Sequence, residues 1–164
     1  MADVTTPSEL LIMALRDLHD GELALEQRLG EVRETVRDAD LRAFVEADRA
    51  RSIAQREALI SIVSALGAEP QGEPNVWLRA ILDDAANDAR TIVAGSLRDI
   101  ALTGALRKAK QAERVSYETA IALAGRLGLT QVAGTLTQCR NQEQAADDEL
   151  AQTLARLTAQ DTTA

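Results

Sequence analysis

Acidic side chains interrupt several otherwise apolar helical patterns in this chain. Glu22, Glu113 and Glu143 each take a slot in a run of Leu, Ala and Val residues that recurs at steps of three and four. A second set of polar residues interrupts the segment 41–66 in the same way: Asp48, Arg51 and Gln55. A carboxylate buried between helices is costly unless it pairs with a cation or binds a metal. The spacing therefore predicts a buried polar layer that holds cations.

The interruptions lie near the middles of the predicted helices. Antiparallel packing brings helix middles to one level, so these side chains are expected to converge. Asp147 lies one turn beyond Glu143, and Lys110 lies one turn before Glu113, so both can join the layer. The alternative is that the helices drift out of register and leave these groups at a solvated edge.

Two helical hairpins, 8–67 and 96–157, are predicted to position this layer. Thr6 and Glu9 form a capping box at the start of the first hairpin, with proline at the first helical position. Asp99 completes the same spacing at the start of the second hairpin. Apolar steps that alternate between four and three are typical of helices packed nearly parallel to their neighbours.

A long crossover, 68–95, joins the hairpins and is predicted to carry a shorter helix. Such a link lets the second and third long helices run the same way, which is the ferritin-like wiring. The predicted fold is all-α: a ferritin-like antiparallel four-helix bundle with a long crossover carrying a fifth short helix. We expect a single domain over 1–164, with a frayed polar tail at 158–164.

Composition narrows the classes of function. The formal net charge of -8 argues against binding to nucleic acid or to anionic membranes. The sequence has no apolar run long enough to span a membrane and no signal peptide at its start, so we expect a soluble protein. The single cysteine, Cys139, cannot form an internal disulfide, which indicates a reducing, cytoplasmic location. His19 is the one histidine, so a site built from several imidazoles is excluded.

Three stretches of the chain resemble the YciE/YciF-like family of bacterial ferritin-like, stress-associated proteins. Residues 15–22 read LRDLHDGE, close to the family pattern L-R-D-L-Y-x-A-E. Asp99 to Leu102, followed by Glu113 and Tyr117, and the segment 135–150 follow two further patterns of the family in the same order. The resemblance covers about residues 8 to 157.

The resemblance implies a bundle that holds a two-metal carboxylate site. Glu22, Glu143 and Asp147 match its acidic ligand positions. The remaining positions depart from the family pattern. Arg51 and Lys110 stand where the family has acidic residues, and His19 replaces a tyrosine. Three glutamines occupy further site positions: Gln55, Gln111 and Gln142.

These departures suggest that Arg51 and Lys110 replace the metals as counter-charges. Arginine stays protonated, and its forked guanidinium suits carboxylates. The predicted network is buried, has no catalytic residue and needs no cofactor; it comprises Glu22, Asp48, Arg51, Lys110, Glu113, Glu143 and Asp147. We therefore predict a non-enzymatic bundle protein with a stress-linked structural or interaction role.

Other interpretations stay open at this point. One is a metal-binding, di-iron-type protein with oxidative or metal-handling activity, holding iron or another divalent metal. The ligands in this alternative would be Glu22, Glu113, Glu143, Asp147 and His19. Another is a partner-binding helical module unrelated to stress. The resemblance implies a homodimer, while any other protein partner is unknown. Cys139 is predicted to be an inert core thiol, and Trp77 to anchor the crossover helix to the bundle.

Overall fold

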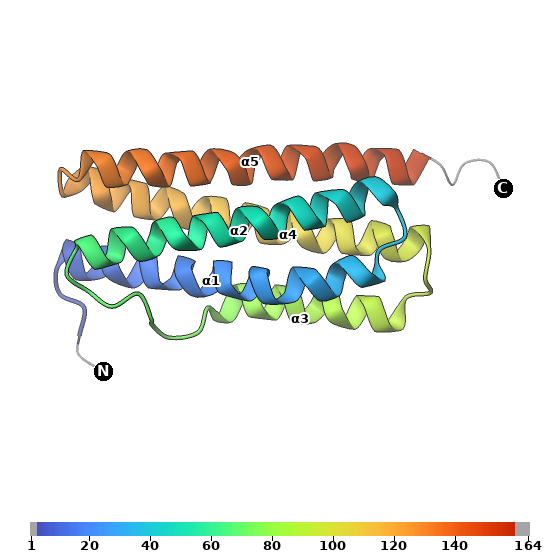
Figure 1. Ribbon diagram of the computed structural model, residues 1–164, viewed down its shortest axis with the longest axis horizontal. Coiled ribbons are helices and arrows are strands. Elements are labelled where there is room, and N and C mark those ends of the chain that lie inside the picture. The colour runs from blue at the N-terminus through green and yellow to red at the C-terminus, as the bar shows by residue number, and fades with distance from the viewer. Residues whose placement is uncertain (1–2, 160–164) are drawn as a thin grey trace.

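The computed structural model describes residues 3–159, and every regular element in that range is an α-helix. Figure 1 shows the long helices lying side by side, with the shorter helix α3 running alongside α1. The helices are α1 Pro7–Thr35, α2 Ala39–Ala65, α3 Val76–Thr91, α4 Ser96–Arg126 and α5 Thr130–Ala159. The all-α prediction is confirmed. The predicted frayed tail begins inside α5, and its residues 160–164 lie outside the described range.

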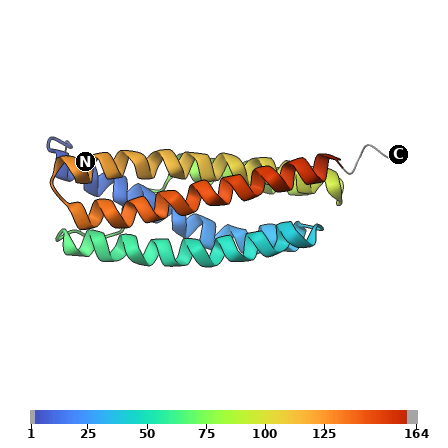
Figure 2. The ribbon, with the colours of Figure 1, turned by 90° about the horizontal axis from the view of Figure 1, so that it is seen from above.

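The four long helices form two antiparallel hairpins, α1–α2 and α4–α5 (Figure 1 and Figure 2). The crossover through α3 returns the chain to the other end of the bundle, so α2 and α4 run in the same direction. This is the ferritin-like arrangement that the long crossover predicted.

Local capping explains where the first helices begin. The Thr6 hydroxyl accepts a hydrogen bond from the Glu9 backbone N–H at 3.2 Å, and the Glu9 carboxylate accepts one from the Thr6 N–H at 2.9 Å. The capping box predicted for α1 is therefore present. Asp38 caps α2 by accepting from the Leu41 N–H at 2.9 Å.

The capping prediction for Asp99 is wrong. Gly95 precedes α4, and no side chain caps that helix. The Asp99 carboxylate instead accepts hydrogen bonds from the backbone N–H groups of Arg37 at 3.0 Å and Asp38 at 2.7 Å. The Asp99 side chain therefore makes a tertiary contact in place of the predicted helix cap. This contact joins the start of α4 to the α1–α2 turn.

Polar contacts fasten α3 to α1, and we call this group the crossover latch: Asp17, Asp20, Asn75, Trp77 and Arg79. The Asn75 side chain caps α3 and also donates to the Asp17 carbonyl at 3.0 Å. Trp77 Nε1 donates to Asp17 at 3.1 Å, and Arg79 makes a bidentate pair with Asp20. Trp77 also packs against the core, as predicted.

A glycine in α1 permits this close approach. A Cβ atom added at Gly21 would lie 3.1 Å from both Asn75 Nδ2 and Leu78 Cδ2. The absence of a side chain at Gly21 therefore lets the start of α3 sit directly on α1.

Two apolar clusters fill the bundle, one on each side of a polar layer. The first includes Leu25, Leu102 and Leu150, and the second includes Leu15, Leu59 and Leu136. Cys139 packs in the second cluster, where burial raises the pKa of its thiol to about 12. Such a thiol is a poor nucleophile, which agrees with the prediction of an inert core cysteine.

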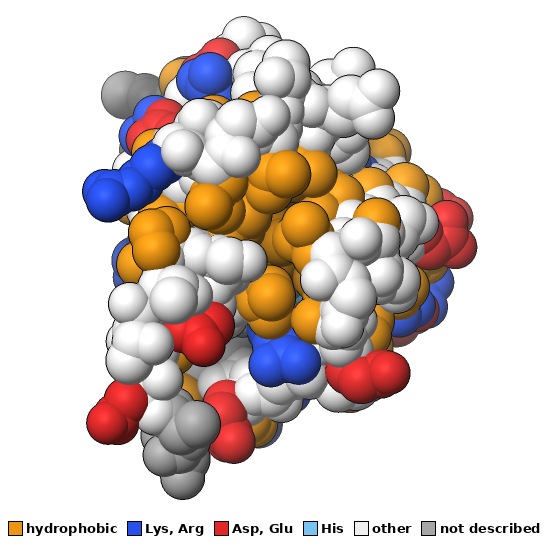
Figure 3. Space-filling view, turned by 90° about the vertical axis from the view of Figure 1, so that its left-hand side faces the viewer, with side chains coloured by type: hydrophobic (Ala, Val, Ile, Leu, Met, Phe, Trp, Pro, Cys, Tyr) orange, Lys and Arg blue, Asp and Glu red, His pale blue; other side chains and the backbone are white. Residues whose placement is uncertain are grey.

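Apolar side chains also gather at one end of the bundle, where α2 and α4 end (Figure 3). Partly buried residues from that end close the second cluster: Leu66, Leu127, Leu129 and Val132. No helix within residues 3–159 is both long enough and apolar enough to cross a membrane.

Candidate functional site

Lys110 lies at the centre of the polar layer. Its Nζ atom is 2.7 Å from Glu143 Oε2, 3.0 Å from Glu113 Oε2 and 3.1 Å from Asp48 Oδ2. The Lys110 side chain is 0% exposed, and the carboxylates reach it from α2, α4 and α5. These contacts are close ion pairs. One ammonium group therefore pairs with carboxylates from three helices.

Gln55 and Arg51 complete the α2 side of the layer. Gln55 Nε2 donates to Glu143 Oε1 at 3.0 Å and to Gln142 Oε1 at 2.9 Å. Arg51 Nη1 donates to Asp48 Oδ1 at 2.6 Å. The Arg51 side chain is 23% exposed, whereas Asp48 is fully buried. Arg51 therefore reaches the layer from its solvent edge.

Glu22 enters the layer from α1 and pairs with a tyrosine. The Tyr117 hydroxyl donates to Glu22 Oε1 at 2.7 Å, and both residues are 0% exposed. Burial raises the pKa of Tyr117 well above its usual value, so the hydroxyl stays a donor. Glu22 Oε2 has no hydrogen-bond partner within the described part of the chain. The role of Tyr117 was not predicted, although it is the only tyrosine and lies one turn after Glu113.

Burial and the two basic residues set the protonation of the layer. Burial, with the nearby Glu143, raises the pKa of Glu22 to about 8. Burial also raises the pKa of Glu113 well above its usual value. Burial opposes ionisation of Glu143 too, but the Lys110 ammonium outweighs it and lowers the Glu143 pKa.

These shifts bring the charges into balance. The pKa of Lys110 is raised well above its usual value because Asp48, Glu113 and Glu143 outweigh the effect of burial. Two cations, Lys110 and Arg51, face four carboxylates. The charges cancel when two carboxylates carry protons. Burial raises the pKa values of Glu22, Asp48 and Glu113, so the protons lie among these three acids, while Glu143 stays ionised beside Lys110.

The structure places some predicted site residues elsewhere. Asp147 does not face Lys110: it accepts from Arg107 Nε at 2.7 Å and from Gln111 Nε2 at 3.0 Å. Because α4 and α5 are antiparallel, one turn forward from Glu143 leads to the α4 turn that carries Arg107. Arg51 likewise pairs with Asp48 and not with the glutamates. The predicted pairing of Asp147 with the two central cations is therefore wrong.

His19 is buried next to the layer but pairs with none of its members in the described contacts. Burial, followed by the charge of Arg56, lowers the pKa of His19. The imidazole is therefore neutral at pH 7 and adds no charge to the balance around Lys110.

Comparison with known proteins shows the family of this chain. Residues 6–163 match the family described as a domain of unknown function, DUF892. The chain belongs to the DUF892 family. No curated protein matches the sequence at a significant level.

Solved structures similar to this DUF892 chain share its helical bundle. The Escherichia coli stress protein YciF matches with a TM-score of 0.91 and 22% identity, over 95% of this chain and 99% of its own. YcfI from Rhodopseudomonas palustris, described as a candidate structural protein, matches with a TM-score of 0.87 and 26% identity, over 91% and 95%. The predicted resemblance to YciE/YciF-like proteins is thus confirmed.

A third neighbour is a ferritin-like, diiron-carboxylate protein from Bacillus anthracis str. Ames. It matches with a TM-score of 0.73 and 18% identity, over 92% of this chain and 99% of its own. This likeness supports the ferritin-like fold of the DUF892 chain.

The residues at the centre of this DUF892 chain do not fit a metal ion. A divalent cation needs the carboxylate oxygens that the Lys110 ammonium already contacts, and like charges repel. Within residues 3–159, no group of three or more His, Cys, Asp or Glu side chains has an arrangement suited to a metal. Lys110 supplies the positive charge that the carboxylates require.

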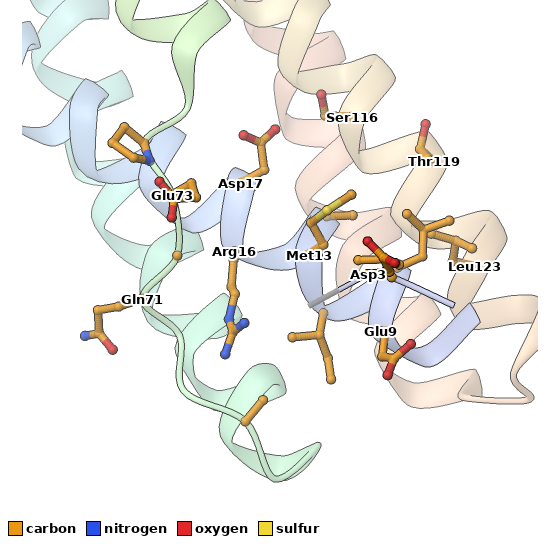
Figure 4. Close-up of a pocket in the computed structure, with 17 residues that line it drawn as sticks. Asp3, Glu9, Met13, Arg16, Asp17, Gln71, Glu73, Ser116, Thr119 and Leu123 are labelled. Atoms are coloured by element: carbon orange, nitrogen blue, oxygen red, sulfur yellow. The ribbon is translucent and has the colours of Figure 1, made fainter. Parts of the chain in front are cut away.

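A groove on the surface is the other candidate region. It has a volume of about 1030 Å³ and lies between α1, the segment 68–74 and α4 (Figure 4). Met13 and Leu123 line it together with charged side chains such as Arg16. Arg16 Nε donates to the Glu69 carbonyl at 2.8 Å, which holds the crossover against α1. None of the residues that line the groove belongs to the layer around Lys110. The groove and the buried layer are therefore separate regions of the molecule.

Proposed function

We propose that this DUF892 chain is a non-enzymatic ferritin-like bundle protein in which a buried ion network replaces a two-metal site. The observation that carries the proposal is the position of Lys110 Nζ, within 3.1 Å of carboxylates from three helices. A buried ammonium that neutralises these acids removes their need for a metal.

The remaining members of the layer support the same function. Gln55 donates to Glu143, and Tyr117 donates to Glu22, so both acids are held by partners within the protein. Both acids are fully buried, so a substrate in solution has no access to them. The network therefore stabilises one packing of the four helices.

A stress-linked structural or interaction role in the cytoplasm completes the proposal. YciF is a stress protein, and YcfI is described as a candidate structural protein. Both share the bundle that this chain forms. The net charge of -8 suits a protein that stays apart from nucleic acid and anionic membranes.

Metal analysis of the full chain tests the proposal. Protein purified without chelators should contain iron, manganese and zinc far below stoichiometric amounts. It should also show no ferrous-iron oxidation above a buffer control. Stoichiometric metal that is lost on Glu22→Gln or Glu143→Gln would overturn the proposal in favour of a metal-handling protein.

We also propose that the chain forms a homodimer through α1 and α4. Leu10, Met13 and Val115 expose 38%, 50% and 52% of their surface on these helices. Grouped apolar surface of this kind marks protein contacts. Light scattering at micromolar concentration should give a dimer mass for the wild type and a monomer mass for Met13→Glu. Val93→Glu, a matched change at an exposed residue outside these helices, should leave the dimer intact.

A further inference from the structure

We propose that the groove beside the crossover binds a basic amphipathic helix of a partner protein, with an apolar stripe on one face and Lys or Arg residues beside it. The groove lies between α1, the segment 68–74 and α4 (Figure 4), and we call it the docking groove. The inference rests on the interaction role in the proposed function and names the kind of partner for that role.

The first argument is the short length of α3. Its apolar stripe, Leu78, Leu82 and Ala85, packs in the first apolar cluster, beside the later half of α1 and the first half of α4. Among the described residues, α3 contributes none to the second cluster, which fills the other half of the bundle. A fifth helix therefore covers one half of the face that α1 and α4 share (Figure 1). The docking groove lies on the half that α3 leaves uncovered.

The second argument is the apolar lining of the docking groove. Leu10 and Met13 of α1 line it and are 38% and 50% exposed, and Leu123 of α4 lines the opposite wall. The α1 wall, residues 9–17, is about 13 Å long, which matches a helix of about two to three turns. An apolar groove between helices suits one face of an amphipathic helix, whose apolar side chains recur at steps of three and four.

The third argument is the charge around this apolar lining. Four acids line the docking groove: Asp3, Glu9, Asp17 and Glu73. In the part of the chain that the structure describes, none of them forms an ion pair with a lysine or an arginine. The lining has one basic residue, Arg16, and its Nε atom already donates to the Glu69 carbonyl. Four acids against one base attract a basic partner and repel nucleic acid and anionic membranes.

The attachment of α3 to α1 combines the same two kinds of contact. Leu78 is buried against the bundle, and Arg79 beside it pairs with Asp20 at 2.7 Å. Asp17 lies one turn before Asp20 on α1 and lines the docking groove. A partner helix with leucines against Met13 and a Lys or Arg near Asp17 would repeat this arrangement on the uncovered half of α1.

The docked helix would compete with the proposed dimer. Leu10 and Met13 line the docking groove and also belong to the proposed dimer contact. One face cannot hold a partner helix and a second copy at the same residues. Saturation with a partner helix should therefore convert the dimer into a complex of one chain with one helix.

A synthetic peptide tests the docking groove in the full chain. The probe is a fluorescein-labelled helical peptide of about 14 residues, with Leu at steps of three and four, Lys on both sides of the Leu stripe and Ala elsewhere. Fluorescence anisotropy should show saturable binding of one peptide per chain. A matched peptide with Glu in place of Lys should bind at least about tenfold more weakly.

Two pairs of variants locate the binding. Glu73→Lys should weaken binding of the Lys peptide about fivefold, whereas Glu149→Lys, the same change at an exposed acid of α5, should not. Met13→Ser should weaken binding about tenfold, whereas Val93→Ser, at an exposed residue outside the docking groove, should not. All four residues are exposed, so the variants should keep the wild-type helix content by circular dichroism.

The outcomes separate the docking groove from the function on which it rests. Absence of saturable binding would overturn the inference, and so would equal binding of the Lys and Glu peptides or equal effects of Glu73→Lys and Glu149→Lys. Light scattering that shows a persistent dimer with the peptide bound would support the docking groove and overturn the dimer contact. Stoichiometric metal in a protein that binds the peptide at the docking groove would overturn only the metal-free ion network.

Discussion

The Lys110 layer and the crossover latch both join helices by ion pairs, but they differ in exposure to water. Lys110 and Asp48 are 0% exposed, whereas the latch pair Arg79 and Asp20 are 37% and 14% exposed. A charge at the latch that loses its partner can be solvated. A charge in the layer that loses its partner stays buried and unpaired. The ion pairs of the two regions have similar lengths, yet removing one partner should reduce the free energy of unfolding much more in the layer than in the latch.

The largest expected effect comes from removing the Lys110 ammonium. In the presence of a chelator, Lys110→Ala should lower the free energy of unfolding by about 3–5 kcal/mol, because buried carboxylates are left without their counter-charge. Urea unfolding followed by circular dichroism measures the loss. Lys108→Ala, which removes the exposed lysine of the same helix, is the control and should change little. A Lys110→Ala protein as stable as this control would show that the layer is not held by its charge.

The next effect is a dependence of stability on pH. The folded pKa of Glu22 is raised to about 8, so the native state binds a proton that the unfolded chain releases near its ordinary pKa of 4.5. This contribution is fully present below the unfolded pKa and is lost as pH rises towards 8. Between pH 6.5 and 8, Glu22 alone should reduce stability by about 2 kcal/mol, at about 1.4 kcal/mol per pH unit.

His19 does not oppose this trend in the chosen window. Its folded pKa is lowered, so its contribution is complete above its ordinary value of 6.5 and is lost only at lower pH. Denaturant midpoints measured from pH 6.5 to 8 should therefore fall, and Glu22→Gln should flatten the slope. A wild-type slope of zero or of opposite sign would contradict the protonation assigned to Glu22.

Arg51 offers a finer comparison, because it shares Asp48 with Lys110 but lies at the edge of the layer. Arg51→Ala should cost about 1 kcal/mol, less than Lys110→Ala, since Asp48 keeps the central ammonium. Unfolding of the two variants under the same conditions gives the comparison. An Arg51→Ala loss equal to that of Lys110→Ala would mean that both cations are needed equally.

The periodicity of the chain predicts the level of the polar layer but not every partner in it. Glu22, Glu113 and Glu143 replace apolar residues at helix middles, and antiparallel packing alone brings them together. Asp147 shows the limit of this reasoning. Spacing along α5 gives its turn, but whether it faces Lys110 or Arg107 depends on the rotation of α5 against α4.

Two other residues could not have been assigned from local patterns. Asp99 fits a capping spacing, yet it binds the α1–α2 turn because two backbone N–H groups there need an acceptor. Tyr117 joins Glu22 across 95 residues of sequence, a contact that requires the relative placement of α1 and α4. Such pairings depend on how the helices are placed relative to one another, and helical periodicity gives no information on that placement.

The smallest expected effect lies in the crossover latch. Arg79→Ala removes the bidentate pair with Asp20, but the Asn75 backbone N–H still donates to Asp20 Oδ2 at 2.6 Å. Because Asp20 keeps this partner and has access to water, the loss should stay below about 1 kcal/mol. Urea unfolding of Arg79→Ala beside Arg114→Ala, which breaks a more exposed pair on α4, provides the measurement. A loss as large as that of Lys110→Ala would show that burial does not separate the two regions.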